Sequence, residues 1–217
     1  MDSSRLSDLQ KDLLREFFAR ERRFVLTGGG ALVGFHLRHR TSNGLDLFGK
    51  PPIDLTDARR AMESAAAALG GTLEAIRVHP DFQRLLVRRG VDACVVDLVV
   101  DRAPDVDPVI EERDGVRLHS LREIGANKVC ALLGRAEIRD LVDLRAILRR
   151  GLALEDLLRD AERKDGGVSA ATLAWVLGSV RIGADATLLG GVDPMDLEQF
   201  RSELVRRLRA LAMPSNG

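Results

Sequence analysis

The chain has 217 residues, 45% of them hydrophobic, which is enough for one large domain or for a core with a second lobe. Acidic and basic residues balance at 33 each, so net charge gives no argument for binding to nucleic acid or to a membrane. The first ten residues are polar and no apolar run approaches the length of a membrane span, so we expect neither a secretory leader nor a membrane helix.

The two cysteines, Cys94 and Cys130, both lie in apolar runs and are interpreted as small core residues. Nothing in the chain calls for a disulfide. We therefore expect the protein to work in a reducing, cytoplasmic environment.

The first 120 residues predict a mixed sheet with helices. Leucines at helical spacing predict a helix over 6–17, and apolar stretches bounded by turn residues predict strands. A strand is predicted to run into the glycines at 28–30, and ALVGFHLRHR is predicted to be a helix of two to three turns. Further strands are predicted in 44–49, 72–78, 82–89, 92–101 and 116–120, with a helix over 54–71 and a loop over 103–115.

Beyond residue 120 the pattern is helical throughout. Four helical segments are predicted within 121–135, 137–151, 154–164 and 169–181. The last helix has the best start signals, because Asp193 can cap it, Pro194 suits its first turn and Asp196 favours its N-terminus. The fold class is therefore α+β, with an α/β core over 1–120 and a helical C-terminal lobe over 121–217 that packs on it.

A run of glycines is the first candidate for chemistry. TGGGALVGF follows a predicted strand and opens a predicted helix, and such a turn lets backbone N–H groups approach phosphates closely. It is not a P-loop, because Gly34 is not followed by Lys and Ser or Thr. The spacing of Gly28, Gly30 and Gly34 is one residue too long for a dinucleotide fingerprint. The run predicts either a phosphate-binding turn or a tight turn without a ligand.

Two carboxylates bear on the choice between a phosphate-binding turn and a turn without a ligand. Asp46 points away from Leu45 and Leu47 on one predicted strand, and Asp97 is alone among valines on another. Two such acids could meet across a sheet and hold a divalent cation with oxygen ligands, as Mg²⁺ requires. The alternative is two unrelated acids, each satisfied by a backbone amide or by one of the 29 arginines.

Lys128 is unusual in a chain with only four lysines. It falls on a helical stripe with Leu121, Ile124 and Leu132, so its ammonium must be paired or must reach solvent by snorkelling. A compact ammonium at this place could contact phosphate.

An acidic pair follows on the next predicted helix. Asp140 and Asp143 are three residues apart and share a face with Leu144, while Arg139 is spaced to pair with Asp143. A structural ion network is the alternative to a role in a site.

A basic stretch completes the candidates. In GFHLRHR, His36 and His39 are three residues apart on the predicted helix and are flanked by arginines that disfavour a cation. We interpret this stretch as a basic face that meets phosphate or solvent.

In order and spacing, four stretches resemble the AbiEii/AbiGii-type nucleotidyltransferase toxins, the enzymatic half of type IV toxin–antitoxin and phage-defence pairs. They are LTGGGALVGFHLRHRTSNGLDLF, VVDLVV, EIGANKVCAL and RDLVDLRAIL. The resemblance implies a nucleotidyltransferase-like fold, a nucleoside triphosphate substrate, Mg²⁺ or Mn²⁺ and a cognate antitoxin. It also implies an acceptor hydroxyl on RNA, such as a tRNA 3′ end, or on protein.

The resemblance also implies roles for individual residues. Gly28, Gly29 and Gly30 would shape the turn at the phosphates, and Ser42 would donate to a triphosphate oxygen. Asp46 and Asp97 would be metal ligands.

Two further roles follow from the same resemblance for residues of the helical half. Lys128 would neutralise phosphate charge, and Asp140 would belong to an acidic helix near the site.

Two departures from the family pattern affect this interpretation. Gly30 stands where GGTAL has threonine, and Gly44 stands where SxDxD has its first acid. Loss of one metal carboxylate should remove much of the activity. The main hypothesis is therefore a metal-dependent nucleotidyltransferase. The alternatives are a catalytically degenerate nucleotide- or partner-binding module on the same fold and, less favoured, a small dinucleotide-binding protein.

Overall fold

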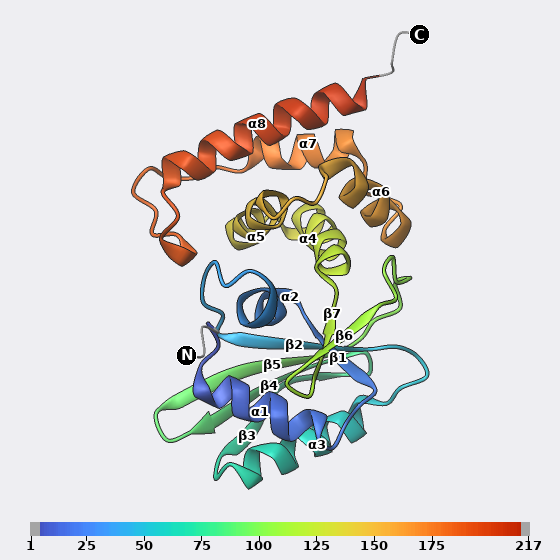
Figure 1. Ribbon diagram of the computed structural model, residues 1–217, viewed down its shortest axis with the longest axis vertical. Helices are drawn as coiled ribbons and strands as arrows, with labels where there is room; N and C mark the ends of the chain where they lie inside the picture. The colour runs from blue at the N-terminus through green and yellow to red at the C-terminus, as the bar shows by residue number, and fades with distance from the viewer. Residues whose placement is uncertain (1–4, 214–217) are drawn as a thin grey trace. The chain divides into compact units, whose positions relative to one another are not determined.

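The structure is a computed structural model that describes residues 5–213. The chain divides into two compact units, which are treated separately below (Figure 1). Unit 1 comprises Met1–Arg102 and Val109–Ser120, and unit 2 comprises Ala103–Pro108 and Leu121–Gly217.

Unit 1 is built on a mixed sheet of seven strands in the order β3-β4-β5-β2-β1-β7-β6. β2 pairs with β5 and β1 with β7 in parallel, while the other neighbours are antiparallel. The strands are β1 Phe24–Thr27, β2 Gly44–Gly49, β3 Thr72–His79, β4 Phe82–Arg89, β5 Asp92–Val100, β6 Ile110–Arg113 and β7 Val116–His119.

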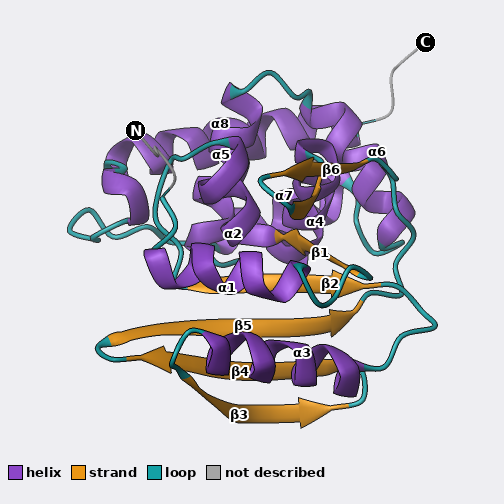
Figure 2. Cartoon of the chain, turned by 60° about the horizontal axis from the view of Figure 1, so that its bottom comes forward, coloured by secondary structure: helices purple, strands orange, loops and turns teal. Residues whose placement is uncertain are grey.

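Two helices lie along this sheet, α1 (Asp8–Phe18) and α3 (Leu55–Ala68) (Figure 2). Ser7 begins α1 with a capping box, in which its hydroxyl accepts from the Gln10 N–H and the Gln10 side chain accepts from the Ser7 N–H. Asp54 caps α3 by accepting from the Thr56 N–H at 2.7 Å.

The central strands bury alternate residues, as expected when helices cover one face of a sheet. Leu47 and Leu98 are fully buried, whereas Asp46 and Asp97, one position back on the same strands, are only partly buried. The apolar face forms the core of unit 1, and the polar face carries the two candidate carboxylates.

The structure corrects two predictions in unit 1. The predicted helix 31–40 instead begins in the glycines as α2 (Gly28–Ala31), continues as the π-helix η1 (Leu32–His36) and ends there. His39 therefore lies beyond the helix and not one turn from His36.

The second correction concerns the predicted loop 103–115. It contains β6, which pairs with β7 through the Asp114–Gly115 turn. The strand was missed because IEER has little apolar alternation, and it is the pairing with β7 that makes it a strand.

Unit 2 is helical, as predicted. Asp193 caps the last helix by accepting from the Met195 and Asp196 N–H groups at 2.8 and 3.1 Å. The helices are α4 Leu121–Arg135, α5 Ile138–Arg149, α6 Leu154–Lys164, α7 Ala170–Ser179 and α8 Pro194–Ala212, with a short 3₁₀ turn, η2, at Leu189–Gly191. With the mixed sheet of unit 1, this confirms the α+β class.

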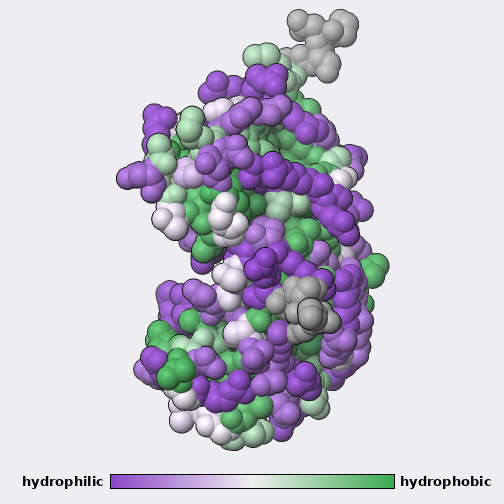
Figure 3. Space-filling view, turned by 60° about the vertical axis from the view of Figure 1, so that its left-hand side comes forward, coloured by the Kyte–Doolittle hydropathy of each residue, from purple (hydrophilic) through white to green (hydrophobic). Residues whose placement is uncertain are grey.

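The surface carries mostly hydrophilic side chains on the face drawn in Figure 3, with apolar residues in small patches between them. Exposed apolar residues such as Val91 and Trp175 occur far apart in the sequence, which is normal for protein surfaces. Across residues 5–213, every helix is too short or too polar to span a bilayer.

Candidate active site

The glycine turn at the end of β1 lies against Asp46. Gly28 has a φ of +60°, a conformation that L side chains rarely adopt. A Cβ atom placed on Gly28 would lie 2.2 Å from Asp46 Oδ2. The backbone and the carboxylate are therefore close enough that only glycine fits between them.

The next two glycines pack against the loop that leads into β2. A Cβ atom on Gly29 would lie 2.8 Å from Arg40 Nη2 and 3.4 Å from Ser42 Oγ. A Cβ atom on Gly30 would lie 3.3 Å from the Gly44 carbonyl oxygen, which leaves little room for the threonine of the family pattern. The turn thus brings the glycines, Ser42 and a buried arginine together.

Ser42 is held in this loop by hydrogen bonds to its neighbours. Its hydroxyl donates to the Gly44 carbonyl at 3.0 Å, and its own carbonyl accepts from Gln10 Nε2 at 2.9 Å. Gln10, on α1, is itself buried. To donate to a phosphate, the hydroxyl would have to leave the Gly44 carbonyl.

Thr27 adds a polar atom to the turn. It is 2% exposed, and within residues 5–213 its Oγ1 has no hydrogen-bond partner. Thr27 precedes the first glycine and pairs with Asp46 in the β1–β2 register. A buried hydroxyl without a partner is costly, so a ligand that accepts from it would relieve the cost.

Charged residues form one row across the polar face of the sheet. Strand register aligns Thr27 with Asp46, Asp46 with Asp97, Asp97 with Arg84, and Arg84 with Arg77. Side chains directly opposite each other on neighbouring strands point to the same face. The two predicted acids are therefore nearest neighbours, as the sequence suggested.

Asp97 has an arginine partner. Arg84 Nε and Nη2 donate to the two Asp97 oxygens at 2.8 and 2.7 Å. These bonds and the carboxylate charge raise the pKa of the Arg84 guanidinium above its usual range. Asp97 thus combines both interpretations offered by the sequence, an acid beside Asp46 and an acid satisfied by arginine.

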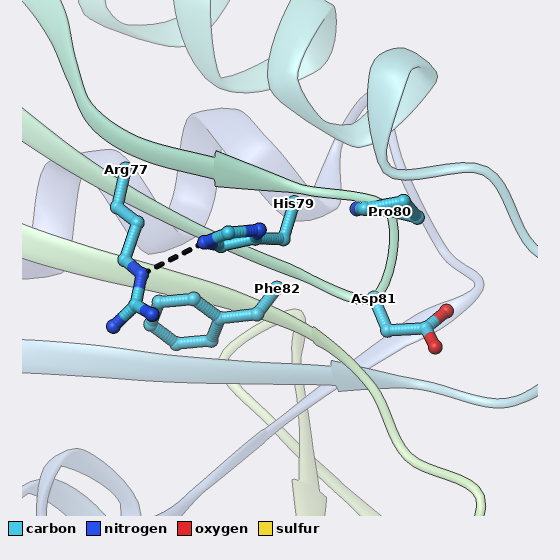
Figure 4. Close-up of a pocket in the computed structure, with 5 residues that line it drawn as sticks. All are labelled: Arg77, His79, Pro80, Asp81 and Phe82. Carbon is cyan, nitrogen blue, oxygen red and sulfur yellow. Dashed lines mark hydrogen bonds between the residues drawn. The ribbon is translucent and has the colours of Figure 1, made fainter.

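The row ends in an open hollow at the β3–β4 turn (Figure 4). Arg77 Nε lies 3.0 Å from His79 Nε2, and the guanidinium carbons of Arg77 and Arg84 lie 5.9 and 5.7 Å from the centre of the Phe82 ring. Both guanidinium groups make cation–π contacts with this ring, and that of Arg84 also pairs with Asp97.

The carboxylates fit a magnesium ion with one condition. Mg²⁺ is held by one or two protein carboxylates together with water and substrate phosphates. Asp46 and Asp97 supply such a pair, and no cluster of three or more His, Cys, Asp or Glu residues suited to a metal occurs within residues 5–213. The condition is that Asp97 exchanges the Arg84 guanidinium for the ion.

Lys128 and Asp140 belong to unit 2, where they bind each other. Lys128 Nζ lies 2.7 Å from Asp140 Oδ1 and 2.7 Å from Asp143 Oδ2, and both carboxylates are completely buried. Arg135 Nε also donates to Asp140 at 2.8 Å. Burial acts to raise the pKa of Asp140, but the bonds from Arg135 and Lys128 outweigh it and lower the pKa. Arg139, which the sequence spaced to pair with Asp143, contacts Glu137 at 2.5 Å.

Two residues at the unit 1 site were not singled out from the sequence. Thr27 could have been found because it stands directly before the glycines, and Arg84 because it alternates with the buried residues of its strand. Arg40 was predicted as part of the basic stretch GFHLRHR, but its burial against Gly29 depends on how the loop folds.

Solved structures define the class to which this fold belongs. A putative nucleotidyltransferase from Helicobacter pylori matches with a TM-score of 0.55 and 18% identity over 95% of this chain and 96% of that one. MenT4, a nucleotidyltransferase toxin from Mycobacterium tuberculosis, matches with a TM-score of 0.58 and 16% identity over 96% and 84%. The fold is therefore that of nucleotidyltransferases.

The sequence itself places the chain more narrowly. The family described as "Nucleotidyl transferase AbiEii toxin, Type IV TA system" matches residues 12–213, so the chain belongs to this family of toxin–antitoxin nucleotidyltransferases. The resemblance found in the sequence is thereby confirmed. Among curated proteins there is no significant match.

Proposed function

We propose that the chain transfers a nucleotide from a nucleoside triphosphate to an acceptor hydroxyl, at the site formed by the glycine turn and Asp46. The hydroxyl oxygen would bond to the α-phosphorus, the bond between the α- and β-phosphates would break, and pyrophosphate would leave. The acceptor is an RNA such as a tRNA 3′ end, or a protein hydroxyl, and the cellular partner is a cognate antitoxin. The observation that carries the proposal is the contact between Gly28 and Asp46, beside a Thr27 hydroxyl that has no hydrogen-bond partner among residues 5–213, in a chain of this family.

The phosphate groups of the nucleotide would lie along the turn. The N–H groups of Gly28 and Gly29 stand at the N-terminus of a helical segment, where N–H groups without helical partners attract anions. Thr27 can donate its hydroxyl there without giving up another bond, and Ser42 can donate if it leaves Gly44.

Asp46 and Asp97 would hold Mg²⁺ or Mn²⁺, which when bound supplies positive charge to the transferring phosphate. Asp46 stands at the turn and would fix the position of the phosphates relative to the sheet. Arg84 keeps Asp97 neutralised in the absence of the ion and would move to the phosphates when the ion binds. In this proposal Arg84 has two roles: it neutralises Asp97 before the ion binds, and it binds phosphate afterwards.

Lys128 and Asp140 remain predicted site residues, and their mutual contact supports a further role in holding α4 and α5 together. Their buried cluster makes loss of activity in these variants hard to interpret without a stability measurement. The decisive variants for the site are therefore those of unit 1.

Gly44 supports a second candidate, a degenerate nucleotide-binding module. Gly44 and Asp46 are two residues apart on β2 and face the same side, so an acid at 44 would join the carboxylate pair. A Cβ atom at Gly44 would lie 3.1 Å from the Val95 carbonyl oxygen, a tight contact with the backbone of the paired strand β5. An acid at position 44 therefore requires β5 to give by a few tenths of an ångström, and the melting temperature of Gly44→Asp measures what this costs.

The test is transfer of α-labelled nucleoside triphosphates, with Mg²⁺ or Mn²⁺, onto total bacterial RNA and onto the protein itself. Wild type, Asp46→Asn, Gly44→Asp and the control Asp57→Asn, an exposed acid on α3, are compared at equal folded concentration. We expect label with wild type and with the control, and loss of label with Asp46→Asn. Equal labelling by wild type and Asp46→Asn would reject the site.

Calorimetry separates the two candidates. Each nucleoside triphosphate is titrated with Mg²⁺ into the same four proteins. Binding to wild type without transfer, together with transfer by Gly44→Asp, would establish the degenerate module. Binding and transfer by wild type would establish the enzyme.

A further inference from the structure

The sheet of unit 1 ends in two strands that differ in how open they are to further pairing. β6, at one end, has four residues, three of them charged, and such short, charged strands are how proteins protect an exposed edge. β3, at the other end, has eight residues without proline or lysine, and seven of them are exposed. Figure 2 shows β3 as the outermost strand, and within residues 5–213 it pairs with β4 alone. Its outer edge therefore offers backbone groups to another strand.

The edge strand β3 also exposes apolar side chains. Ile76 is 53% exposed and Val78 is 51% exposed, although β-branched residues are favoured in strands because they pack against cross-strand neighbours. Single exposed apolar residues are normal, but two of them on a long open edge mark a place where another strand can add. The edge thus combines unpaired backbone with apolar surface.

A bulge decides which side chains of β3 share a face. The β3–β4 register skips Ile76, which is therefore an extra residue in β3. Glu74 lies opposite Leu86 on β4. Arg77 lies opposite Arg84, which is two residues from Leu86 and points to the same face. Glu74 and Arg77 therefore share the polar face of the sheet, which residues three apart in a regular strand would not do.

Glu74 and Arg77 carry opposite charges that are not neutralised within the chain. Both are exposed, and among residues 5–213 neither forms an ion pair. The contacts of Arg77 are a hydrogen bond to His79 at 3.0 Å and the face of the Phe82 ring, both at the surface. One acid and one base thus stand on the same face of the open edge, each available to a charge on another strand.

We propose that β3 pairs with β3 of a second copy of this chain, antiparallel and around a twofold axis, so that two sheets join into one. In the register that places Glu74 opposite Arg77 of the second copy, the twofold axis repeats the same pair. Two pairs of opposite charge then form across the junction, each between residues on the polar face. A strand that complements itself in this way fits a second copy better than an unrelated strand.

The same register also matches the apolar side chains. Leu73 lies opposite Val87 on β4 and Val78 lies opposite Gln83, four residues away, so Leu73 and Val78 share the other face of the sheet. The proposed register brings Leu73 of each copy opposite Val78 of the other. It therefore covers the exposed valine while it pairs the charges and the backbone groups.

The test is sedimentation equilibrium of the whole chain at low salt and a series of protein concentrations. No nucleotide or metal is present, so the outcome does not depend on the proposed transfer reaction. The variants are Glu74→Arg, Arg77→Glu and the two combined in one chain. Glu162→Arg and Arg163→Glu, which reverse exposed charges on α6, are the controls, and melting temperatures verify folding.

We expect wild type and the controls to dimerise reversibly. Each single variant should dimerise about tenfold more weakly, because two pairs of like charge replace two pairs of opposite charge. A mixture of the two single variants should dimerise like wild type, since one carries two positive and the other two negative charges on β3. The combined variant should do the same by itself.

Three results would overturn the proposal. The first is a wild type that stays monomeric at every concentration. The second is a dimer that the single variants form as tightly as wild type, which would place the contact on another surface. The third is a mixture of the single variants, or a combined variant, that dimerises no better than the single variants alone, because the charges of Glu74 and Arg77 would then not meet across the junction.

Discussion

The polar face of the unit 1 sheet and the α4–α5 contact of unit 2 both place a basic residue against aspartates, but in opposite surroundings. On the sheet, Arg84 is about half exposed and binds Asp97 at the polar face. Between α4 and α5, Lys128 is 8% exposed and binds two carboxylates that are completely buried. The first arrangement can open for a ligand, whereas the second cannot lose a member without burying an unpaired charge.

This difference separates residues that bind from residues that hold the fold. A charge at a wet surface exchanges partners at little cost, and a charge in the interior is fixed by the penalty of desolvation. Each prediction below tests one side of that contrast, beginning with the largest expected effect.

Lys128→Met should destabilise the protein by about 3–5 kcal/mol, because it removes the ammonium that both buried carboxylates, Asp140 and Asp143, bind. Urea unfolding measures the loss. Lys11→Met, at a partly exposed ion pair on α1, should cost less than about 1 kcal/mol. If Lys128→Met is as stable as the Lys11→Met control, the buried charge cluster of unit 2 does not hold the fold more strongly than an exposed ion pair.

Gly28→Ala should cost at least about 2 kcal/mol, since it combines a positive φ with a Cβ atom that meets Asp46. Gly70→Ala is the matched control, because Gly70 has a φ of +68° and open space around it, and it should cost about 1 kcal/mol. Adding Asp46→Ala should bring the cost of Gly28→Ala close to that of the control. If Gly28→Ala costs as much in the Asp46→Ala background as in wild type, the Asp46 carboxylate does not contact the Gly28 turn.

His36 should make stability fall as the pH drops below its ordinary pKa of about 6.5. Burial lowers its pKa in the folded protein, although the bond to the His119 carbonyl acts in the opposite direction. The unfolded chain therefore binds more protons in this range, and the free energy of unfolding decreases with a slope of at most about 1.4 kcal/mol per pH unit.

His36→Gln should flatten this dependence between pH 7 and pH 5, as measured by urea unfolding at a series of pH values. His79→Gln, at an exposed position on β3, is the control. Parallel curves for wild type and His36→Gln would show that the buried imidazole does not set the slope.

Arg84→Met should change stability by less than about 1 kcal/mol, as expected for a half-exposed ion pair. Its larger consequence is on ion binding, because Asp97 no longer exchanges a guanidinium for the metal. We expect Mn²⁺ affinity in the absence of nucleotide, followed by paramagnetic relaxation, to rise several-fold. Arg102→Met, which removes a similar bidentate contact with Asp81, should leave it unchanged. If the Mn²⁺ affinity of Arg84→Met does not rise, Asp97 is not a ligand of the metal.

The sequence predicted most elements of the fold, and its errors have identifiable causes. The helices of unit 2 follow from their apolar spacing, and α8 begins at Asp193 as its cap signal indicated. The helix after the glycines was predicted over 31–40 but lies over 28–36, because glycine has a low helix propensity and the first turn is made of glycines. β6 was missed because its pairing with β7, not its own composition, makes it a strand.

By itself the sequence determined the family, the α+β class and the position of Asp46 and Asp97 on the polar side of their strands, since strand alternation is a local property. Only the tertiary structure decided which residues those acids meet. Asp97 faces both Asp46 and Arg84 because β5 lies between β2 and β4, and Lys128 meets two carboxylates because α4 packs on α5. These contacts join residues from 12 to 51 positions apart in the chain, further than one turn of a helix or one repeat of a strand, so no local pattern encodes them.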